Sequence, residues 1–176
     1  FLHHVIDSGQ KAQDMMKGLM EYSRINTRQD MITDVDANKV MKLCIAALEW
    51  HIAHYEVEIK YDNLPIIKTD AAKFQRLIFH LLDNSIKFRN KDEKSLVYVT
   101  AKKDGNNWLF YVADNGIGID PKYHTKIFDM FYRINPDSEG YVGVGAGLAI
   151  CQKTVEHFGG KMWVESELEK GTTFSF

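Results

Sequence analysis

Apolar residues recur at intervals of three and four along the first part of the chain, from residue 1 to about residue 28. This spacing predicts one amphipathic helix, because residues three and four apart share a helix face. At 1.5 Å per residue the helix is about 40 Å long. A single helix cannot bury its stripe alone, so we expect a partner: a helix preceding residue 1, a second copy, or the rest of this domain. The stripe consists of Phe1, Val5, Ala12, Met15, Met16, Leu19 and Tyr22.

Shorter segments with strand and helix patterns follow. In order they are a strand over 31–35, a helix over 37–54, a strand over 55–61, a brief strand at 66–67 and a helix over 71–88. The strand over 55–61 is predicted by its alternation of apolar and charged residues. Asp36 and Asp70 stand where aspartates cap helices, because their oxygens accept hydrogen bonds from first-turn amides.

The second half of the chain is richer in strands. The pattern predicts a hairpin of 95–103 and 106–114 around Asp104-Gly105, a short helix from Pro121, an apolar helix over 148–158, and strands over 161–166 and 172–176. Residues 131–147 show no clear period. Loops of that length are either functional or disordered, which makes this segment informative.

Composition and charge narrow the class of protein. The 176 residues carry a net charge of −2, so nothing indicates a broad nucleic-acid surface and we expect no nucleic-acid partner. No apolar run approaches the roughly 18 residues that span a bilayer. Cys44 and Cys151 fall in apolar helical patterns, which favours reduced, buried thiols. We expect one cytoplasmic domain, with or without an appendage, and membrane attachment of the full-length protein stays open.

The first candidate site lies where a β-rich run ends. The run over 108–112 stops at Asp114, and Gly116 and Gly118 follow. Glycines allow positive φ and the close approach of a ligand to the main chain. A carboxylate at such a strand end can accept a hydrogen bond from an exocyclic amino group, such as that of adenine. The alternative is a plain hairpin turn, because Asn115-Gly116 is a standard turn signal.

Three polar residues of the predicted helix over 71–88 share a face. His80, Asn84 and Lys87 stand at positions i, i+4 and i+7. A carboxamide oxygen such as that of Asn84 is a hard ligand suited to Mg²⁺. A lysine one turn later supplies a point charge for a phosphate. The alternative is an ordinary solvated face beside the apolar one.

Glycines also precede the apolar helix over 148–158. Gly143, Gly145 and Gly147 stand directly before it, and glycines at a helix N-terminus make a phosphate site from backbone amides and the helix dipole. The run also loosely matches a dinucleotide-binding fingerprint, with Glu165 as the ribose acid. That fingerprint needs a buried strand before the first glycine, and polar residues 135–140 stand there instead.

Five motifs occur in a characteristic order. They are the Asn84 helix, Asp114-Asn-Gly-Ile-Gly118, Phe128-Asp-Met-Phe131, Gly143-Val-Gly-Ala-Gly147 and Gly171-Thr-Thr-Phe174. Together they resemble the N, G1, F, G2 and G3 boxes of the ATP-binding domain of sensor histidine kinases. The resemblance covers residues 31–176 and implies a two-layer α/β sandwich, the Bergerat fold, with a mixed, mostly antiparallel sheet backed by helices. Residues 1–28 are similar to the second helix of the kinase dimerisation hairpin.

The resemblance also implies roles for individual residues. Asp114 receives the adenine amino group, and Asn84 holds the Mg²⁺ that bridges the phosphates of ATP. Lys87 and Arg133 meet phosphate oxygens. The other implied contacts are Phe88, Gly116, Gly118, Ile119 and Thr173 around adenine, with Thr173 closing the back of the pocket, and Gly143, Gly145, Gly147 and Leu148 around the triphosphate as part of a mobile lid.

Two positions depart from the family pattern. His80 stands where ATPase relatives place a water-activating glutamate and where histidine kinases usually have asparagine. A neutral imidazole there can act as a base or orient the acceptor, and a histidine satisfied in the core is the alternative. Ala146 replaces a leucine that the family commonly has in its G2 box.

No histidine fits the family's phosphoacceptor motif, which is a histidine followed by an acid, an apolar residue, Arg or Lys, and a proline two residues on. His3-His4-Val-Ile-Asp departs from it, and so do His51, His54, His124 and His157. The resemblance therefore implies a kinase part that binds Mg-ATP and transfers the γ-phosphate to a histidine outside this sequence. Implied partners are a response-regulator receiver domain and a second copy joined through the hairpin. The alternatives are a non-catalytic nucleotide-sensing module and a gyrase-type ATPase.

Overall fold

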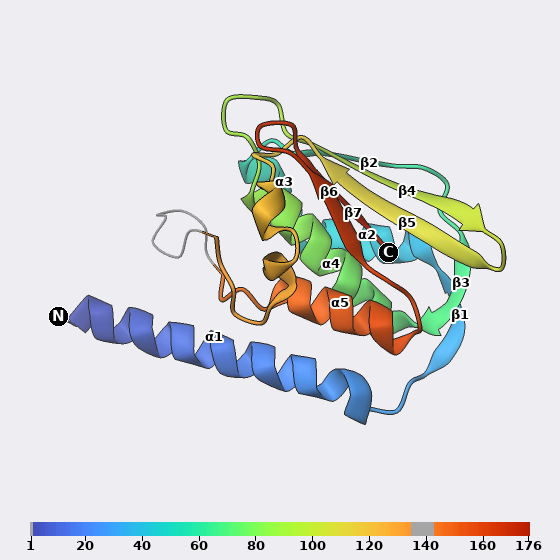
Figure 1. Cartoon of the computed structure of the whole chain (residues 1–176), viewed down its shortest axis with the longest axis horizontal. Coiled ribbons are helices and arrows are strands. Elements are labelled where there is room, and N and C mark those ends of the chain that lie inside the picture. Colours follow the sequence, from blue (N-terminus) through green and yellow to red (C-terminus); the bar gives the residue numbers. More distant parts are fainter. Residues whose placement is uncertain (1, 135–142) are drawn as a thin grey trace.

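The computed structural model describes residues 2–134 and 143–176, and Figure 1 shows a sheet with helices packed against it. The main sheet has the order β2-β4-β5-β7-β6, with bounds Glu58–Tyr61, Leu96–Asp104, Asn107–Asp114, Thr172–Ser175 and Trp163–Ser166. β2 and β4 are parallel, and the other neighbours are antiparallel. β1 (Ile32–Asp36) and β3 (Ile66–Asp70) form a separate antiparallel pair. The expected mixed, mostly antiparallel sheet is confirmed.

The helices that cover the sheet lie on one of its faces (Figure 1). They are α2 (Ala37–Ala47), α4 (Ala71–Lys87) and α5 (Gly147–His157), with α4 between the other two. Two 3-10 turns, η1 (Pro121–Tyr123) and η2 (Lys126–Phe128), precede α5. The apolar face of α4 packs into one core with the inner face of the sheet, through Phe74, Leu77, Ile78, Leu81, Leu82 and Ile86 on the helix and Val97, Val99 and Val112 on the strands.

The predicted helix over 37–54 is interrupted at Leu48. α2 ends at Ala47 and α3 (Glu49–His54) follows, with Leu48 at φ −103° and ψ 6° between them. Leu48 is 1% exposed, so the chain bends around a core side chain and no glycine or proline marks the break. The next strand begins at Glu58 rather than at residue 55, because Glu56 takes a left-handed φ of 51°. The β4–β5 turn is Gly105-Asn106, one residue later than predicted.

The long helix α1 (Leu2–Thr27) runs beside α5 and extends beyond it (Figure 1). Its docked face shares only Tyr22 with the predicted stripe: Tyr22 packs against a small cluster that contains the buried Ile25, and a Cβ on Gly18 would lie 2.9 Å from the Ala146 Cβ. Met16 and Leu19 of the stripe stay 61% and 54% exposed. The helix therefore packs on its own domain while its apolar stripe remains open. Within the described residues, no helix is both long and apolar enough to cross a membrane.

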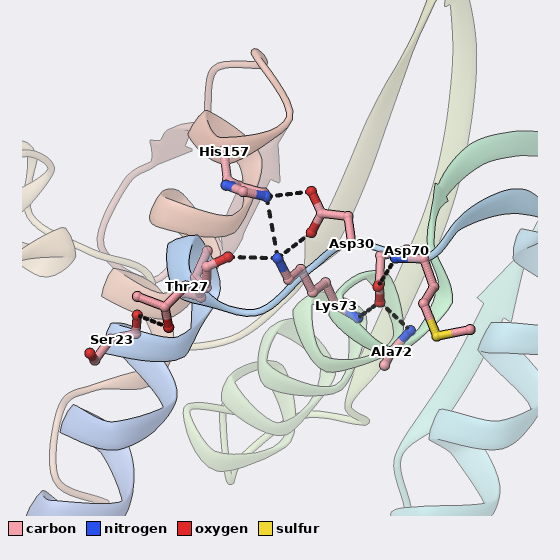
Figure 2. A network of polar contacts seen from close by, with 9 residues as sticks. Ser23, Thr27, Asp30, Asp70, Ala72, Lys73 and His157 are labelled. Atoms are coloured by element: carbon pink, nitrogen blue, oxygen red, sulfur yellow. Dashed lines mark hydrogen bonds and ion pairs between the residues drawn. The ribbon is translucent and has the colours of Figure 1, made fainter.

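A cluster of charged side chains joins the end of α1 to the rest of the domain (Figure 2). Lys73 of α4 donates to the Ile25 carbonyl at 2.6 Å and pairs with Asp30, which follows α1. His157 at the end of α5 places its Nε2 2.8 Å from the other Asp30 oxygen. Lys73 and then His157 hold the pKa of Asp30 below its ordinary value. We call Asp30, Lys73 and His157 the joint, because they tie three separate elements together.

The cap of α4 sits directly beside the joint. Asp70 accepts the amides of Ala72 and Lys73 at 3.0 Å each on one oxygen, as its position in the sequence predicted. Its other oxygen accepts the amide of Met31 at 2.9 Å (Figure 2). The same carboxylate therefore starts α4 and anchors the residue that precedes β1.

Candidate functional site

Asp114 ends β5 at the middle of the sheet, beside the C-terminal half of α4. One carboxylate oxygen accepts the Gly116 amide at 2.9 Å, and the other accepts the Ser85 hydroxyl at 3.0 Å. The Thr172 amide of β7 also bonds this carboxylate. Burial raises the pKa of Asp114, and the Gly116 amide, the Ser85 hydroxyl and the Thr172 amide oppose the shift. The carboxylate is thus held by neutral donors only, and its charge has no cation among the groups that act on it.

The glycines around Asp114 allow backbone segments to touch. A Cβ on Gly116 would lie 2.4 Å from the Phe88 carbonyl oxygen, and one on Gly171 would lie 2.0 Å from the Asp114 carbonyl oxygen. Gly118, at φ +68°, would place a Cβ 2.0 Å from the Glu167 carbonyl oxygen. These positions need glycine because backbone fills the space of a side chain. The turn after Asp114 is therefore pressed against the end of α4 and the β6–β7 connection.

Phe88 and Ile119 flank this turn. The Phe88 carbonyl accepts the Ile117 amide at 3.0 Å, and the Phe88 side chain is 43% exposed. The Ile119 amide donates to the Ser166 hydroxyl at 2.8 Å, and its side chain packs against the core. An exposed aromatic ring such as that of Phe88 is suited to packing on the face of a flat base.

The sheet register separates Thr172 from Thr173. Thr172 is opposite Asp114, and Thr173 is opposite Ala113 on β5. Because side chains alternate across a sheet, Thr172 shares the Asp114 face and Thr173 points to the other face. The register therefore places Thr172, and not the predicted Thr173, on the face of the sheet that carries the Asp114 carboxylate.

On α4, the row of polar side chains has distinct neighbours. His80 Nε2 lies 3.2 Å from a carboxylate oxygen of Glu21, which comes from α1 and also pairs with Arg76 at 3.1 Å. Lys87 pairs with Asp83 one turn earlier. Asn84 is partly exposed between them, and the described residues offer its side chain no hydrogen bond. Its carboxamide oxygen fits a hard cation such as Mg²⁺, with the other ligands coming from a phosphate and water.

The glycine run leads into α5 next to this row. The Lys87 ammonium lies 3.9 Å from where a Cβ on Gly143 would be, and His80 Nδ1 lies 3.3 Å from the same point on Gly147. Gly145, at φ +76°, accepts the Phe131 amide on its carbonyl at 2.9 Å and leaves no space for a Cβ beside Tyr132 and Arg133. The run is therefore packed between α4 and residues 131–133.

The N-terminus of α5 has no side-chain cap among the described residues. Ala146 occupies its N-cap position and supplies no side-chain hydrogen bond, so the first-turn amides lack a side-chain cap. Leu148 packs against the core with part of its surface exposed. An uncapped helix start behind three glycines favours an anion such as a phosphate. Residues 135–142 of the predicted lid lie outside the described residues.

Sequence reasoning missed the residues that surround these groups: Glu21 and Asp83, which pair with His80 and Lys87, Arg76, which pairs with Glu21, and Ser85 and Thr172 beside Asp114. Ser85 directly follows Asn84 and stands one helical turn after Leu81, so a polar residue on the buried face of the helix was the available signal. Glu21 had no such signal, because its contact with His80 spans 59 residues. These residues show that α1 and β7, and not only α4 and β5, contribute side chains and backbone around the predicted site residues.

Comparisons with known proteins agree with this arrangement. The family described as "Histidine kinase-, DNA gyrase B-, and HSP90-like ATPase" matches residues 69–176. "Cyanobacterial phytochrome A" of Nostoc sp. (strain PCC 7120) is 34% identical over 176 residues, which are 100% of this chain and 23% of that protein. The chain therefore spans about a quarter of the length of this relative.

Two solved structures share the fold. Full-length ShkA, in complex with AMPPNP, has a TM-score of 0.80 at 25% identity over 97% of this chain and 36% of its own. Histidine kinase ThkA, in complex with the response regulator protein TrrA, has a TM-score of 0.74 at 21% identity over 98% of this chain and 48% of its own. Fold, motif order and family match coincide on the same residues. The chain therefore belongs to the family of histidine kinase-, DNA gyrase B- and HSP90-like ATPases, and its fold is that of histidine kinase catalytic domains.

Proposed function

We propose that this chain binds Mg-ATP and is the catalytic part of a two-component sensor histidine kinase. The observation that carries the proposal is the position of Asp114. Its carboxylate lies at a strand end, held by three neutral donors, with glycine backbone on both sides and an exposed Phe88 ring nearby. The exocyclic amino group of adenine supplies the further donor that such a carboxylate favours.

The phosphates of the nucleotide fit the other end of the site. Lys87 and the amides at the start of α5 supply positive potential, and Arg133 lies beside Gly145 of the glycine run. Asn84 would hold Mg²⁺, which neutralises the charge that develops on the phosphates during transfer. The residues of this chain would contribute mainly by positioning the γ-phosphate, because phosphoryl transfer needs alignment and charge neutralisation more than covalent help. The acceptor histidine would come from a helix outside this sequence.

The proposal extends to partners. ThkA is solved with a response regulator, which supports a receiver domain as the recipient of the phosphate here. The exposed stripe of α1, with Met16 and Leu19, supports dimerisation through a helical hairpin in the full-length protein. We expect the domain to work in the cytoplasm, where ATP and reduced thiols such as the buried Cys44 and Cys151 are found.

Calorimetric titration with AMPPNP, with and without Mg²⁺, tests the nucleotide site. We expect a Kd in the micromolar range that depends on Mg²⁺. In Asp114→Asn the binding free energy should weaken by about 1–3 kcal/mol, because a carboxamide disrupts the hydrogen bond to the adenine amino group. Ser175→Ala is the matched control, since Ser175 is buried on β7 away from the carboxylate. Unchanged affinity in Asp114→Asn would remove the adenine assignment, and no binding by the folded chain would remove the proposal.

A second candidate function is a nucleotide-sensing module that transfers no phosphate. The observation that favours it is the contact of His80 with Glu21. Through this contact, a residue of α4 next to the proposed phosphate site is bonded to α1. In this case nucleotide binding would change how α1 docks. An acceptor helix supplied in trans with labelled ATP distinguishes the two functions: a kinase labels the helix with acid-labile phosphate, and a sensor leaves it unlabelled.

A further inference from the structure

Ser85 is a polar residue on the buried face of α4, and it is 3% exposed. Its hydroxyl lies 3.0 Å from an Asp114 carboxylate oxygen and 3.2 Å from the Leu81 carbonyl oxygen of the preceding turn. A hydroxyl has one hydrogen, so it can donate to only one of these two acceptors at a time. The choice between them depends on whether Asp114 is an acceptor or carries a proton of its own.

Each state of Asp114 has a matching orientation of the Ser85 hydroxyl. When Asp114 is ionised, the hydroxyl donates to it, and the carboxylate can only accept hydrogen bonds from a bound base. When Asp114 is protonated, the hydroxyl can turn to Leu81 and accept from the acid, or the acid can donate into the pocket. The first state suits a purine with a 6-amino group. The second suits a purine with a 6-oxo group, which needs a donor.

We propose that Ser85 is a positioning residue that holds Asp114 as a hydrogen-bond acceptor and thereby sets the preference for 6-amino over 6-oxo purine nucleotides. This inference rests on the proposed function, because it assumes that a nucleotide base meets Asp114. Ser85 itself does not touch the base in this scheme. It acts through the orientation and the charge state of its neighbour.

The protonation state of Asp114 depends on burial and on three hydrogen-bond donors, and the Ser85 hydroxyl is one of these donors. Its bonding groups are the Gly116 amide from the turn, the Thr172 amide from β7 and the Ser85 hydroxyl from α4, and none of them is charged or titratable. Burial raises the pKa of Asp114 against these three donors. The two amides are fixed by the backbone, so the hydroxyl is the one donor that a side-chain substitution can remove. Its removal moves Asp114 toward the protonated, donating state.

The test measures Kd values for AMPPNP and for the corresponding inosine nucleotide, between pH 5 and 9, in the whole chain and in Ser85→Ala and Ser85→Cys. Alanine is a strong helix former, so Ser85→Ala is expected to fold. Cysteine keeps the shape of the side chain, with a somewhat larger sulfur in place of oxygen, but is a weak donor. Ser175→Ala is the matched control, because it removes another buried serine hydroxyl, one that lacks a hydrogen-bond partner among the described residues.

We expect Ser85→Ala to weaken AMPPNP about tenfold at neutral pH, the equivalent of one lost hydrogen bond to a charged group, and to weaken the inosine nucleotide less or not at all. The pH below which AMPPNP binding declines should move upward, and Ser85→Cys should fall between serine and alanine. Ser175→Ala should match the unmodified chain. Equal weakening of both nucleotides, or an unmoved pH profile, would mean that Ser85 only packs and would overturn the inference. No binding by the unmodified chain would instead overturn the proposed function.

Discussion

Asp30 and Asp114 are two carboxylates that each accept several hydrogen bonds, and their partners differ in charge. Asp30 is paired with the Lys73 ammonium and with His157, which lower its pKa. Asp114 is bonded by a hydroxyl and two amides, and burial raises its pKa. One carboxylate is therefore neutralised inside the domain. The charge of the other, Asp114, has no cation beside it among the described residues.

This difference separates a carboxylate that holds the fold together from the one that we propose faces a ligand. An ion pair between elements distant in sequence costs stability when one member is lost, because the other stays buried without a partner. A carboxylate held by neutral donors near a pocket is available to an external donor. Two acidic residues that look alike in the sequence thus serve opposite purposes, and the charge of the neighbours distinguishes them.

The largest effect should come from removing the cation at the joint. Lys73→Met leaves one Asp30 oxygen and the Ile25 carbonyl without their donor, while His157 stays bonded to the other Asp30 oxygen. We expect the free energy of unfolding to fall by about 2–3 kcal/mol, since Lys73 is 11% exposed and Asp30 still meets some solvent. Urea denaturation followed by circular dichroism measures this. Lys170→Met is the control, because the exposed Lys170–Glu167 pair should contribute less than about 0.5 kcal/mol. Equal losses in both variants would contradict the assignment of the joint as a structural ion pair.

A smaller effect of opposite sign is expected at Asp114. Asp114→Asn removes a desolvated charge that no cation in the described part of the chain offsets, so without nucleotide the free energy of unfolding should rise by about 0.5–2 kcal/mol at pH 8. A carboxyl whose pKa is raised on folding binds protons more readily in the native state. The unmodified chain therefore loses stability as the pH rises from 3.8, the ordinary value, through the raised pKa. Thermal unfolding with and without AMPPNP should show a variant that is more stable alone and less stabilised by ligand; a loss of stability without ligand contradicts this account.

The smallest effect is on the pH dependence contributed by Asp30. Its pKa is lowered on folding, so its contribution to stability is present above 3.8, the ordinary value, and is lost as the pH falls through the lowered value. In Asp30→Asn this part of the loss of stability at low pH should disappear, while the pH dependence of stability contributed by Asp114 remains. Urea midpoints measured at closely spaced pH values below 5 test this. The same pH dependence of the midpoint in the variant and in the unmodified chain would show that folding does not lower the pKa of Asp30.

Local signals in the sequence predicted much of this molecule. Asp114, Gly116 and Gly118 sit in one short stretch, and Asp36 and Asp70 cap helices as residues of that type do. The Thr172–Thr173 distinction was missed because it depends on register, and a shift of one residue moves a side chain to the other face.

The contacts of α1 were also beyond the reach of sequence patterns. Asp30 meets Lys73 43 residues later and His157 127 residues later, and no local period carries that information. The apolar stripe of α1 pointed to a partner for Met16 and Leu19, whereas the docked face uses Gly18, a residue without a side chain. Periodicity ranks helix faces by hydrophobicity, and here a close backbone approach decided the docking.

The joint ties α1 to the domain near one end of the helix, so a rotation there is expected to move the other end over a larger distance. Its 26 residues span about 39 Å, and the joint lies at one end. A rotation of about 10° at this pivot would displace the far end by about 7 Å, more than one helical turn. Such a rotation would move the far end sideways, across the helix axis, and would also shift the contacts of Gly18 with Ala146 and of Glu21 with His80, so the position of the far end is coupled to the docking of α1 on the domain.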